Sequence, residues 1–164
     1  MQAIQKLNGN TTHTIGENYG GGIVFYVYDN GQHGLIAATA DQSTVLVWTP
    51  AAFQSTVSNA VRDGVNGGFT NTERIIIQAG VGSYAAQICA NYQGGNYADW
   101  YLPSKFELNL LYLQKDVVGG FANSNYWSST ENNSGSAWGQ GFNNGSQYNL
   151  SKGGANNMRA IRAF

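Results

Sequence analysis

Two apolar runs joined by an Asn-Gly turn place the strongest constraint on the fold. Residues 20–28 read GGGIVFYVY and residues 33–39 read HGLIAAT, both rich in β-branched, aromatic or small apolar side chains. The connecting DNGQ contains Asn30 and Gly31, a pair that favours a tight hairpin turn because both residue types tolerate positive φ. The sequence therefore predicts an antiparallel β-hairpin near its start.

The pattern then changes from strand to helix. A further apolar run, TVLVWT at 44–49, ends at Pro50, and GVNGGF at 64–69 has the composition of a loop. The segment NTERIIIQAG that follows, residues 71–80, predicts a helix capped by Asn71 and ended by Gly80.

Two more helices are expected after Gly80. SYAAQICANY at 83–92 has Ser83 as a candidate cap, and LPSKFELNLLYLQKD at 102–116 places Pro103 in a first turn. Helical spacing assigns one apolar face to each, formed by Tyr84, Ile88 and Tyr92 in the first and by Phe106, Leu110 and Leu113 in the second.

Strand patterns return after about residue 125, in NYWSST, SAWGQGF, SQYNL and MRAIRAF. The order is therefore β, then α, then β, which is typical of an α+β domain. A chain of 164 residues is about one domain long and is expected to form one core.

The charge balance argues against two classes of partner. The formal net charge is −1, from 8 basic and 9 acidic side chains, so no broad electrostatic surface is expected for nucleic acid or an anionic membrane. No stretch approaches the roughly 18 apolar residues of a membrane span, and the opening residues lack the regions of a signal peptide. We expect no nucleic acid partner, no membrane insertion and, in this chain, no secretion signal.

The reactive residue types give no catalytic or metal-binding pattern. Cys89 is the single cysteine, so no internal disulfide forms, and its apolar neighbours indicate a buried structural thiol. His13 and His33 lie far apart and are expected at the surface or in turns. GVGSYA at 80–85 matches a dinucleotide loop only superficially, because it lies between two helices. We expect no catalytic residue, no metal and no cofactor; acid–base chemistry by paired carboxylates stays a remote alternative.

Several segments together resemble a known family. NYADWYLPSKFELNLLY, YWSSTE, AWGQGF and MRAIRAF resemble a bacterial and phage family with a C-type lectin-like fold, which includes the C-terminal domains of collagen-like adhesins and the variable proteins of diversity-generating retroelements. The resemblance covers about residues 15–164 and includes the opening hairpin. Residues 1–14 are polar and are interpreted as an N-terminal arm, either mobile or in contact with a partner.

Residues 129–157 contain far more Asn, Gly and Ser than a loop requires. In retroelement-diversified relatives a reverse transcriptase replaces adenines in selected codons, and Asn codons are favoured targets that yield Ser, Gly, Tyr, Leu or Ala. The resemblance thus implies that the segment records randomisation, at Gly139, Gly141, Tyr148, Asn149, Leu150, Ser151, Gly153, Gly154, Ala155, Asn156 and Asn157. The alternatives are a polar loop in an undiversified adhesin and an assembly domain of a phage or surface fibre.

Strand alternation divides this segment into inward and outward positions. Trp138 and Phe142 would face one side of a strand and pack inward, together with Trp127. Amide and small side chains around a tyrosine would then form an adaptable binding surface, as in antibody paratopes. The predicted ligand-binding residues are Gly139, Gly141, Asn143, Asn144, Gln147, Tyr148, Asn149, Ser151, Asn156 and Asn157.

The resemblance implies a binding protein whose ligand is a protein or a glycan, located at a cell surface or on a virion, and it allows a homo-oligomer. Calcium-dependent sugar binding is not expected, because the Glu-Pro-Asn, Gln-Pro-Asp and Trp-Asn-Asp motifs of such lectins are absent. The formylglycine-generating enzymes share a similar fold but use paired cysteines, whereas this chain has only Cys89. We therefore expect no enzymatic activity.

Overall fold

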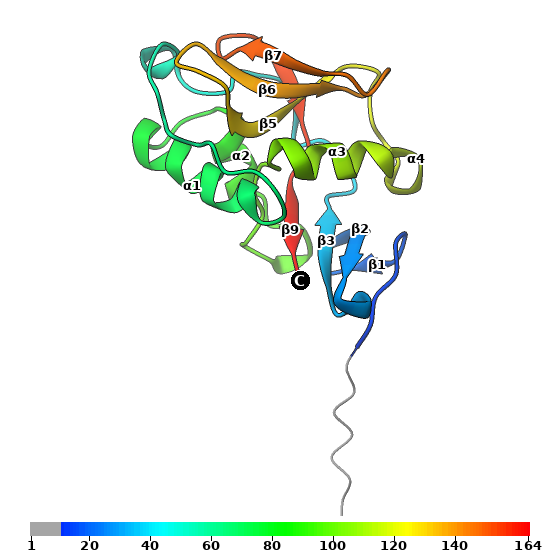
Figure 1. The fold of residues 1–164 in the computed structure, drawn as a ribbon. Helices are drawn as coiled ribbons and strands as arrows, with labels where there is room; N and C mark the ends of the chain where they lie inside the picture. Colours follow the sequence, from blue (N-terminus) through cyan, green and yellow to red (C-terminus); the bar gives the residue numbers. More distant parts are fainter. Residues whose placement is uncertain (1–10) are drawn as a thin grey trace, which may run out of the picture.

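The computed structural model describes residues 11–164, which form two β-sheets with helices packed beside them (Figure 1). The first sheet has the order β1-β2-β3-β9 and the second the order β4-β8-β5-β6-β7. All strand pairs are antiparallel except β5 with β8. The strands are β1 (Asn18–Tyr19), β2 (Gly22–Tyr28), β3 (His33–Ala37), β4 (Ser43–Leu46), β5 (Asn125–Glu131), β6 (Ser136–Gly141), β7 (Gln147–Ser151), β8 (Asn156–Met158) and β9 (Ile161–Ala163).

The predicted opening hairpin is confirmed as β2 and β3, with Tyr28 paired to His33. Its connection is wider than a two-residue turn, because a short 3-10 turn, η1 (Asp29–Gly31), occupies it. Three consecutive residues, Asp29, Asn30 and Gly31, have positive φ, a conformation that most side chains disfavour. Asn and Gly tolerate it, which explains why this pair occupies the turn.

The helices confirm the α+β class and correct several predicted boundaries. They are α1 (Gly67–Ala79), α2 (Ala85–Asn91), α3 (Lys105–Leu113) and α4 (Lys115–Val118). Helix α1 begins inside the segment predicted as loop, so Asn71 is not its cap but a buried residue whose side chain bonds the backbone of Arg62. Ser83 is also not a cap, because Tyr84 holds that position in α2. Gly80 does end α1, as predicted.

Helix α3 begins at Lys105, two residues after the expected Pro103, and turns a partly different face to the core. Ser104 is its N-cap and forms a capping box with Glu107, so Pro103 precedes the helix instead of starting it. The predicted apolar stripe was wrong at two of its three positions, because Phe106 is 42% exposed and Leu113 64% exposed, whereas Leu110 is partly buried against the core. Leu108 and Leu111 are the buried positions. The buried Glu107 belongs to the same inner face, which is why hydropathy alone assigned the wrong side.

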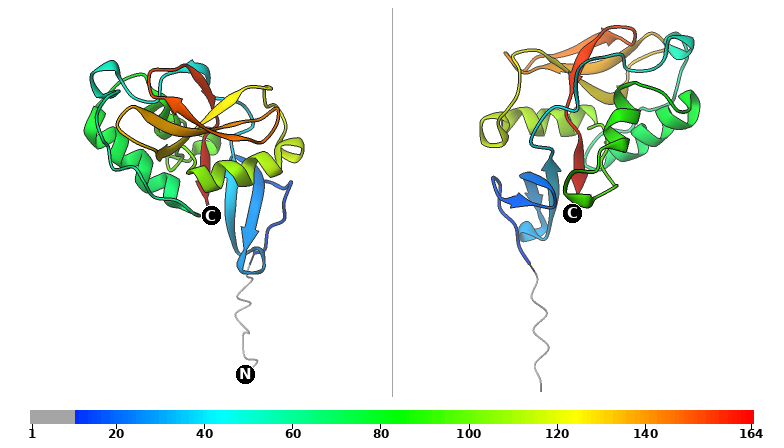
Figure 2. Two further views of the ribbon diagram at one scale, coloured as in Figure 1. Left: turned by 45° about the horizontal axis from the view of Figure 1, so that its top comes forward. Right: turned by 180° about the vertical axis from the view of Figure 1, so that it is seen from behind.

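Two apolar clusters hold the layers together. One lies between α1, α2 and the second sheet and contains Trp48, Trp100 and Trp127. The other joins α3 to both sheets and contains Leu108 and Phe142. Tyr84, Ile88 and Tyr92 of α2 all pack on the first cluster, as their spacing predicted. Figure 2 shows α3 between the opening hairpin and the β5–β6–β7 layer.

The two ends of the described chain meet at the first sheet. His13 is buried, contrary to the expected surface position: its ring lies 3.7 Å from that of Tyr19 and 5.0 Å from that of Phe164. His33 is exposed at the start of β3. Of the predicted arm, residues 1–10 lie outside the described residues, whereas His13 donates its backbone N–H to the Gly31 carbonyl at 2.8 Å.

Candidate functional site

The predicted ligand-binding residues follow one another along β6, β7 and β8 and the turns between them, at the upper margin of the fold in Figure 1. The segment 129–157 is therefore mostly sheet. Asn143, Asn144, Tyr148, Asn149 and Ser151 are exposed, as predicted.

None of the helices among residues 11–164 has the length and apolar character to cross a membrane.

Gly139 and Gly141 are buried, so their predicted exposure was wrong. A Cβ on Gly139 would lie 2.5 Å from Leu150 Cδ1, and one on Gly141 would lie 3.2 Å from Tyr148 Cε2. Strand alternation separated these glycines correctly from Trp138 and Phe142 on the opposite face of β6. It could not reveal that side chains from β7 and from the β6–β7 turn cover the glycine face.

The exposed residues of β7 divide between two faces of the sheet. Tyr148 is paired with Gly139 and Asn149 with Trp138. Since directly paired residues share a face, Tyr148 lies on the glycine side and Asn149 on the side of Trp138. The predicted site is therefore two adjoining surfaces around an outer strand.

On the glycine side, Tyr148 and Asn144 form an exposed polar pair. The Asn144 amide donates to the Tyr148 hydroxyl oxygen at 2.9 Å. Hydrogen bonds from Asn144 and then Ser146 hold the pKa of the Tyr148 phenol below its ordinary value. Asn144 also accepts from the Ser146 backbone N–H at 3.0 Å, so the turn orients both side chains before any ligand arrives.

On the other side, β6 and β7 face the start of α3. The Lys105 ammonium lies 3.4 Å from the centre of the Trp138 ring, and Gln147 donates to the Lys105 carbonyl at 3.0 Å. Trp138 is only half-buried, so its predicted role as a core anchor was wrong, whereas Trp127 and Phe142 are fully buried. Beside it is a recess of about 420 Å³ lined by Asp63, Lys105, Phe106, Asn109, Gly145 and Gln147.

Sequence reasoning missed the contribution of α3 to this surface. Helical spacing places Phe106 on the apolar face, and no motif singles out Lys105 or Asn109. The signal was present in the Ser104-x-x-Glu107 capping box, which fixes the start of α3 and hence which residues face outward. Asn109 is then placed to accept a hydrogen bond from the buried Gln140 side chain, at 2.9 Å.

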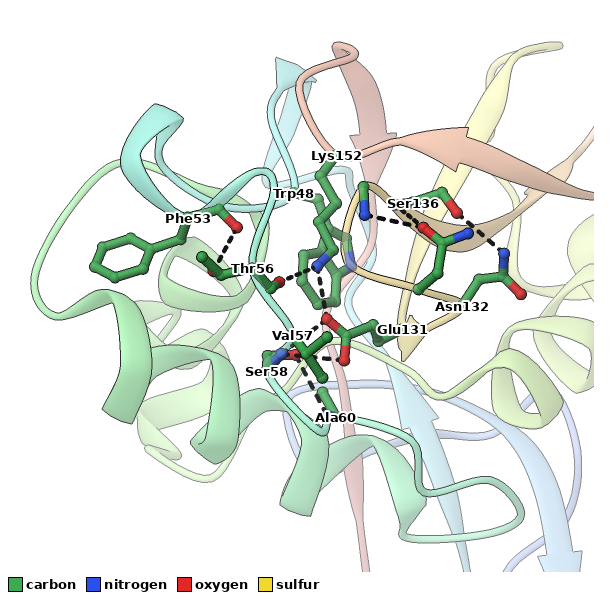
Figure 3. A network of polar contacts seen from close by, with 12 residues as sticks. Trp48, Phe53, Thr56, Val57, Ser58, Ala60, Glu131, Asn132, Ser136 and Lys152 are labelled. Carbon is green, nitrogen blue, oxygen red and sulfur yellow. Dashed lines mark hydrogen bonds and ion pairs between the residues drawn. The ribbon is translucent and has the colours of Figure 1, made fainter.

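A buried ion pair supports the base of the site (Figure 3). Lys152 Nζ lies 2.6 Å from Glu131 Oε1, and both side chains are almost fully enclosed. The ammonium also donates to the Thr56 carbonyl at 2.8 Å, while the carboxylate accepts backbone N–H bonds from Ser58 and Asn59. This network fixes the loop before α1 to β5 and to the end of β7.

Asn157 and Asn156 are less accessible than predicted. Asn157 is buried, which corrects its expected surface position, and its amide lies 3.4 Å from Asp41 Oδ2. The same Asp41 carboxylate accepts from Arg159 Nε at 2.6 Å and from the Tyr126 hydroxyl at 2.7 Å. Asn156 is half-buried in β8. This cluster holds β8 in the sheet, so Asn157 has a structural environment.

The described residues contain no grouping of three or more His, Cys, Asp or Glu side chains placed to hold a metal ion. Cys89 is fully buried, as predicted, and burial raises the pKa of its thiol. Burial also raises the pKa of Glu107, although backbone N–H groups of Ser104, Asn66 and Gly68 and the Tyr101 hydroxyl oppose this shift by donating to the carboxylate. Both groups are components of the interior.

Comparison with protein families supplies one match. The family model described as the Lcl C-terminal domain matches residues 37–162, a segment that contains all the candidate site residues and both apolar clusters except for parts of the opening hairpin. A comparison with curated proteins gave no match.

Proposed function

Because the chain belongs to the Lcl C-terminal domain family, a family of lectin-like binding domains with the C-type lectin-like fold, we propose that it is a non-enzymatic binding domain. Its ligand, a protein or a glycan, lies on the surface formed by β7, the β6–β7 turn and the start of α3. The observation that carries the proposal is the exposed set of amide and tyrosine side chains on a sheet that buried contacts hold from beneath.

The chemistry of this surface suits recognition better than catalysis. Asn143, Asn144 and Asn149 each offer an amide donor and acceptor, and Tyr148 is 38% exposed beside them. Such side chains bind varied ligands at modest entropic cost. Regular strands support them more rigidly than a free loop would. The proposed location of the chain itself is the surface of a cell or a virion.

We further propose that a retroelement diversifies the exposed part of this surface. Tyr148, Asn149 and Ser151 can change without disturbing a buried contact, whereas Lys152 is enclosed with Glu131. Diversification would therefore spare codon 152 although it lies among variable codons. Sequencing of the gene neighbourhood tests this proposal. We expect a reverse transcriptase gene and a near-copy of the 3′ end of the gene. The two copies should differ at adenines, but not within codon 152. An intact locus with neither would contradict diversification and leave the binding proposal standing.

The binding proposal is tested on arrays of glycans and of displayed peptides, followed by affinity measurements on any hit. Tyr148→Ala should weaken binding by about tenfold or more, as expected for an exposed aromatic contact, with the free energy of unfolding changed by under about 0.5 kcal/mol. Val81→Ala is the matched control, because Val81 is 99% exposed between α1 and α2. Equal affinities of the two variants for every hit would contradict the proposed site.

A further inference from the structure

Strand β7 forms one outer edge of the second sheet, because β6 is its only strand neighbour in the order β4-β8-β5-β6-β7. Two backbone bonds at its ends establish which of its residues face that neighbour. Gly141 N–H donates to the Ser146 carbonyl at 2.9 Å, and Lys152 N–H donates to the Gly135 carbonyl at 3.0 Å. Hydrogen-bonded positions alternate along an antiparallel strand, so residues 146, 148, 150 and 152 turn their backbone groups toward β6.

The residues between them turn their backbone groups the other way. Gln147, Asn149 and Ser151 pair with Gln140, Trp138 and Ser136 at positions without ladder bonds. Within residues 11–164 no hydrogen bond engages their three N–H groups or the carbonyls of Gln147 and Asn149, while the Ser151 carbonyl accepts from Gly154 N–H at 2.8 Å. The outer edge of β7 therefore presents alternating free donors and acceptors.

This edge lacks the features that usually protect exposed strands. Residues 147–151 read QYNLS, without charge or proline, and their pairing with β6 has no register shift. Natural proteins commonly protect an edge with lysine, proline or a bulge, because free strand edges recruit other strands. Figure 1 shows β7 at the margin of the fold, with β6 on its inner side.

We propose that the outer edge of β7 binds an extended segment of a protein ligand, which adds a strand to the sheet. The inference rests on the proposed binding function and narrows its ligand from a protein or glycan to an extended polypeptide. The free donors and acceptors recur at every second residue, a spacing that another extended backbone matches. A sugar has no such repeat.

The length of the edge argues for a peptide segment and against a second copy of the chain. Strand β7 has five residues, and pairing over that length buries far less than the roughly 1,200–2,000 Å² of a stable protein interface. Short extended peptides are bound by strand addition over comparable lengths. Self-association through β7 is thus an alternative result of the experiment below.

The side chains of β7 would give such an edge its specificity. Tyr148 and Leu150 lie on one face, and Gln147, Asn149 and Ser151 on the other. An added strand would contact both sets through its own alternating side chains. The backbone hydrogen bonds between β7 and the added strand do not depend on which side chains β7 carries. A diversified surface could therefore keep a constant contribution to affinity while its selectivity changes.

The test compares two substitutions at one residue. A phage-displayed library of random linear peptides is selected on the immobilised full chain, and the affinity of a selected synthetic peptide is measured by calorimetry. Asn149→Pro removes the outward N–H without touching a bond to β6, since proline is tolerated at such edge positions. Asn149→Ala removes the same side chain and keeps the N–H. We expect Asn149→Pro to weaken binding by about tenfold relative to Asn149→Ala.

Amide hydrogen exchange gives an independent readout in the unaltered chain. The amides of residues 147, 149 and 151 should exchange rapidly without peptide and become protected with it, while those of 148 and 150 are protected in both states. Circular dichroism and urea melts verify that Asn149→Pro folds, and Ser151→Pro replaces it if it does not.

Three results would overturn the binding of a peptide by strand addition. Equal loss of affinity in Asn149→Pro and Asn149→Ala would show that side chains alone bind the peptide. If only glycans bind, and Tyr148→Ala weakens their affinity while Asn149→Pro does not, the inference is refuted and the proposed function is retained. A concentration-dependent dimer that Asn149→Pro abolishes, with no peptide selected, would identify a second copy as the occupant.

Discussion

The Glu131–Lys152 pair supports the candidate surface from within the fold. Both side chains are almost fully enclosed, and the Lys152 ammonium also lies 4.9 Å from the centre of the Trp48 ring. Burial of two charges costs free energy that their mutual attraction and hydrogen bonds must offset. The pair is therefore most informative when one member is removed, because the remaining charge then has no partner.

Lys152→Met should destabilise the fold by about 3–5 kcal/mol, since it leaves the Glu131 carboxylate buried without a cation. The double variant Lys152→Met with Glu131→Gln should recover much of that loss, because its interior holds no unpaired charge. Urea melts of both variants and the parent measure these differences. A Lys152→Met midpoint equal to that of the parent would contradict the structural role assigned to the pair.

The sequence could not have identified this pair, because Glu131 and Lys152 are separated by a strand, a turn and another strand within a segment that otherwise looks like polar loop. Lys and Glu are almost never fully buried unless paired, and no local pattern shows the pairing. The exposure of Tyr148 and Asn149 was predictable from their place in the Asn-, Gly- and Ser-rich segment 129–157. The burial of Gly139 was not, because it depends on the Leu150 side chain from the next strand.

Helix α3 contributes to the core on one side and to the candidate surface on the other. Leu108→Ala should cost about 2–5 kcal/mol, because it removes a fully buried side chain from the second apolar cluster. Leu113→Ala should cost under about 1 kcal/mol, since that side chain is 64% exposed. The measurement is the urea midpoint of each variant. The reverse ranking would restore the face first predicted from hydropathy.

Elements differed in how well the sequence defined them. The β2–β3 hairpin was predictable because its turn and both apolar runs are adjacent in the chain, and α2 was predictable because three apolar residues recur at helical spacing. The N-cap of α1 is Asn66, five residues before the predicted cap Asn71, and the helix starts at Gly67 and Gly68, which are poor helix formers. Tertiary contacts determine that start, since Gly68 N–H donates to the buried Glu107 carboxylate at 3.1 Å.

The α+β class and membership of a C-type lectin-like domain family were predictable from the order of patterns and the combination of segments. The closure of the first sheet was not. Strand β9 pairs with β3, so the end of the chain completes the sheet begun by the opening hairpin. The right-hand view of Figure 2, seen from behind, shows β9 beside that hairpin. Pairing between strands so far apart in the chain leaves no short-range signal in the sequence. The pairing places Arg162 of β9 where its guanidinium contacts two other segments that are distant in the sequence.

Arg162 connects β9 to the segment before α3 and gives the fold a specific dependence on pH. Its guanidinium donates to both Asp99 carboxylate oxygens, at 2.7 and 2.9 Å, and to the Gly20 carbonyl at 3.2 Å. These hydrogen bonds hold the pKa of Asp99 below its ordinary value. A carboxyl group with a lowered pKa stabilises the fold above its ordinary pKa, and this contribution is lost as the pH falls through the lowered value.

Asp99→Asn should therefore reduce stability at neutral pH and make little difference in strong acid, where the parent carboxyl is protonated as well. The reduction should be about 1 kcal/mol or less, because the Asp99 side chain is 52% exposed and solvent screens the pair. Urea melts of the parent and the variant, at neutral pH and at about pH 2, give the two differences. A difference that stays constant between these pH values would show that Asp99 acts through packing alone, and a larger difference in acid would reverse the sign of the linkage.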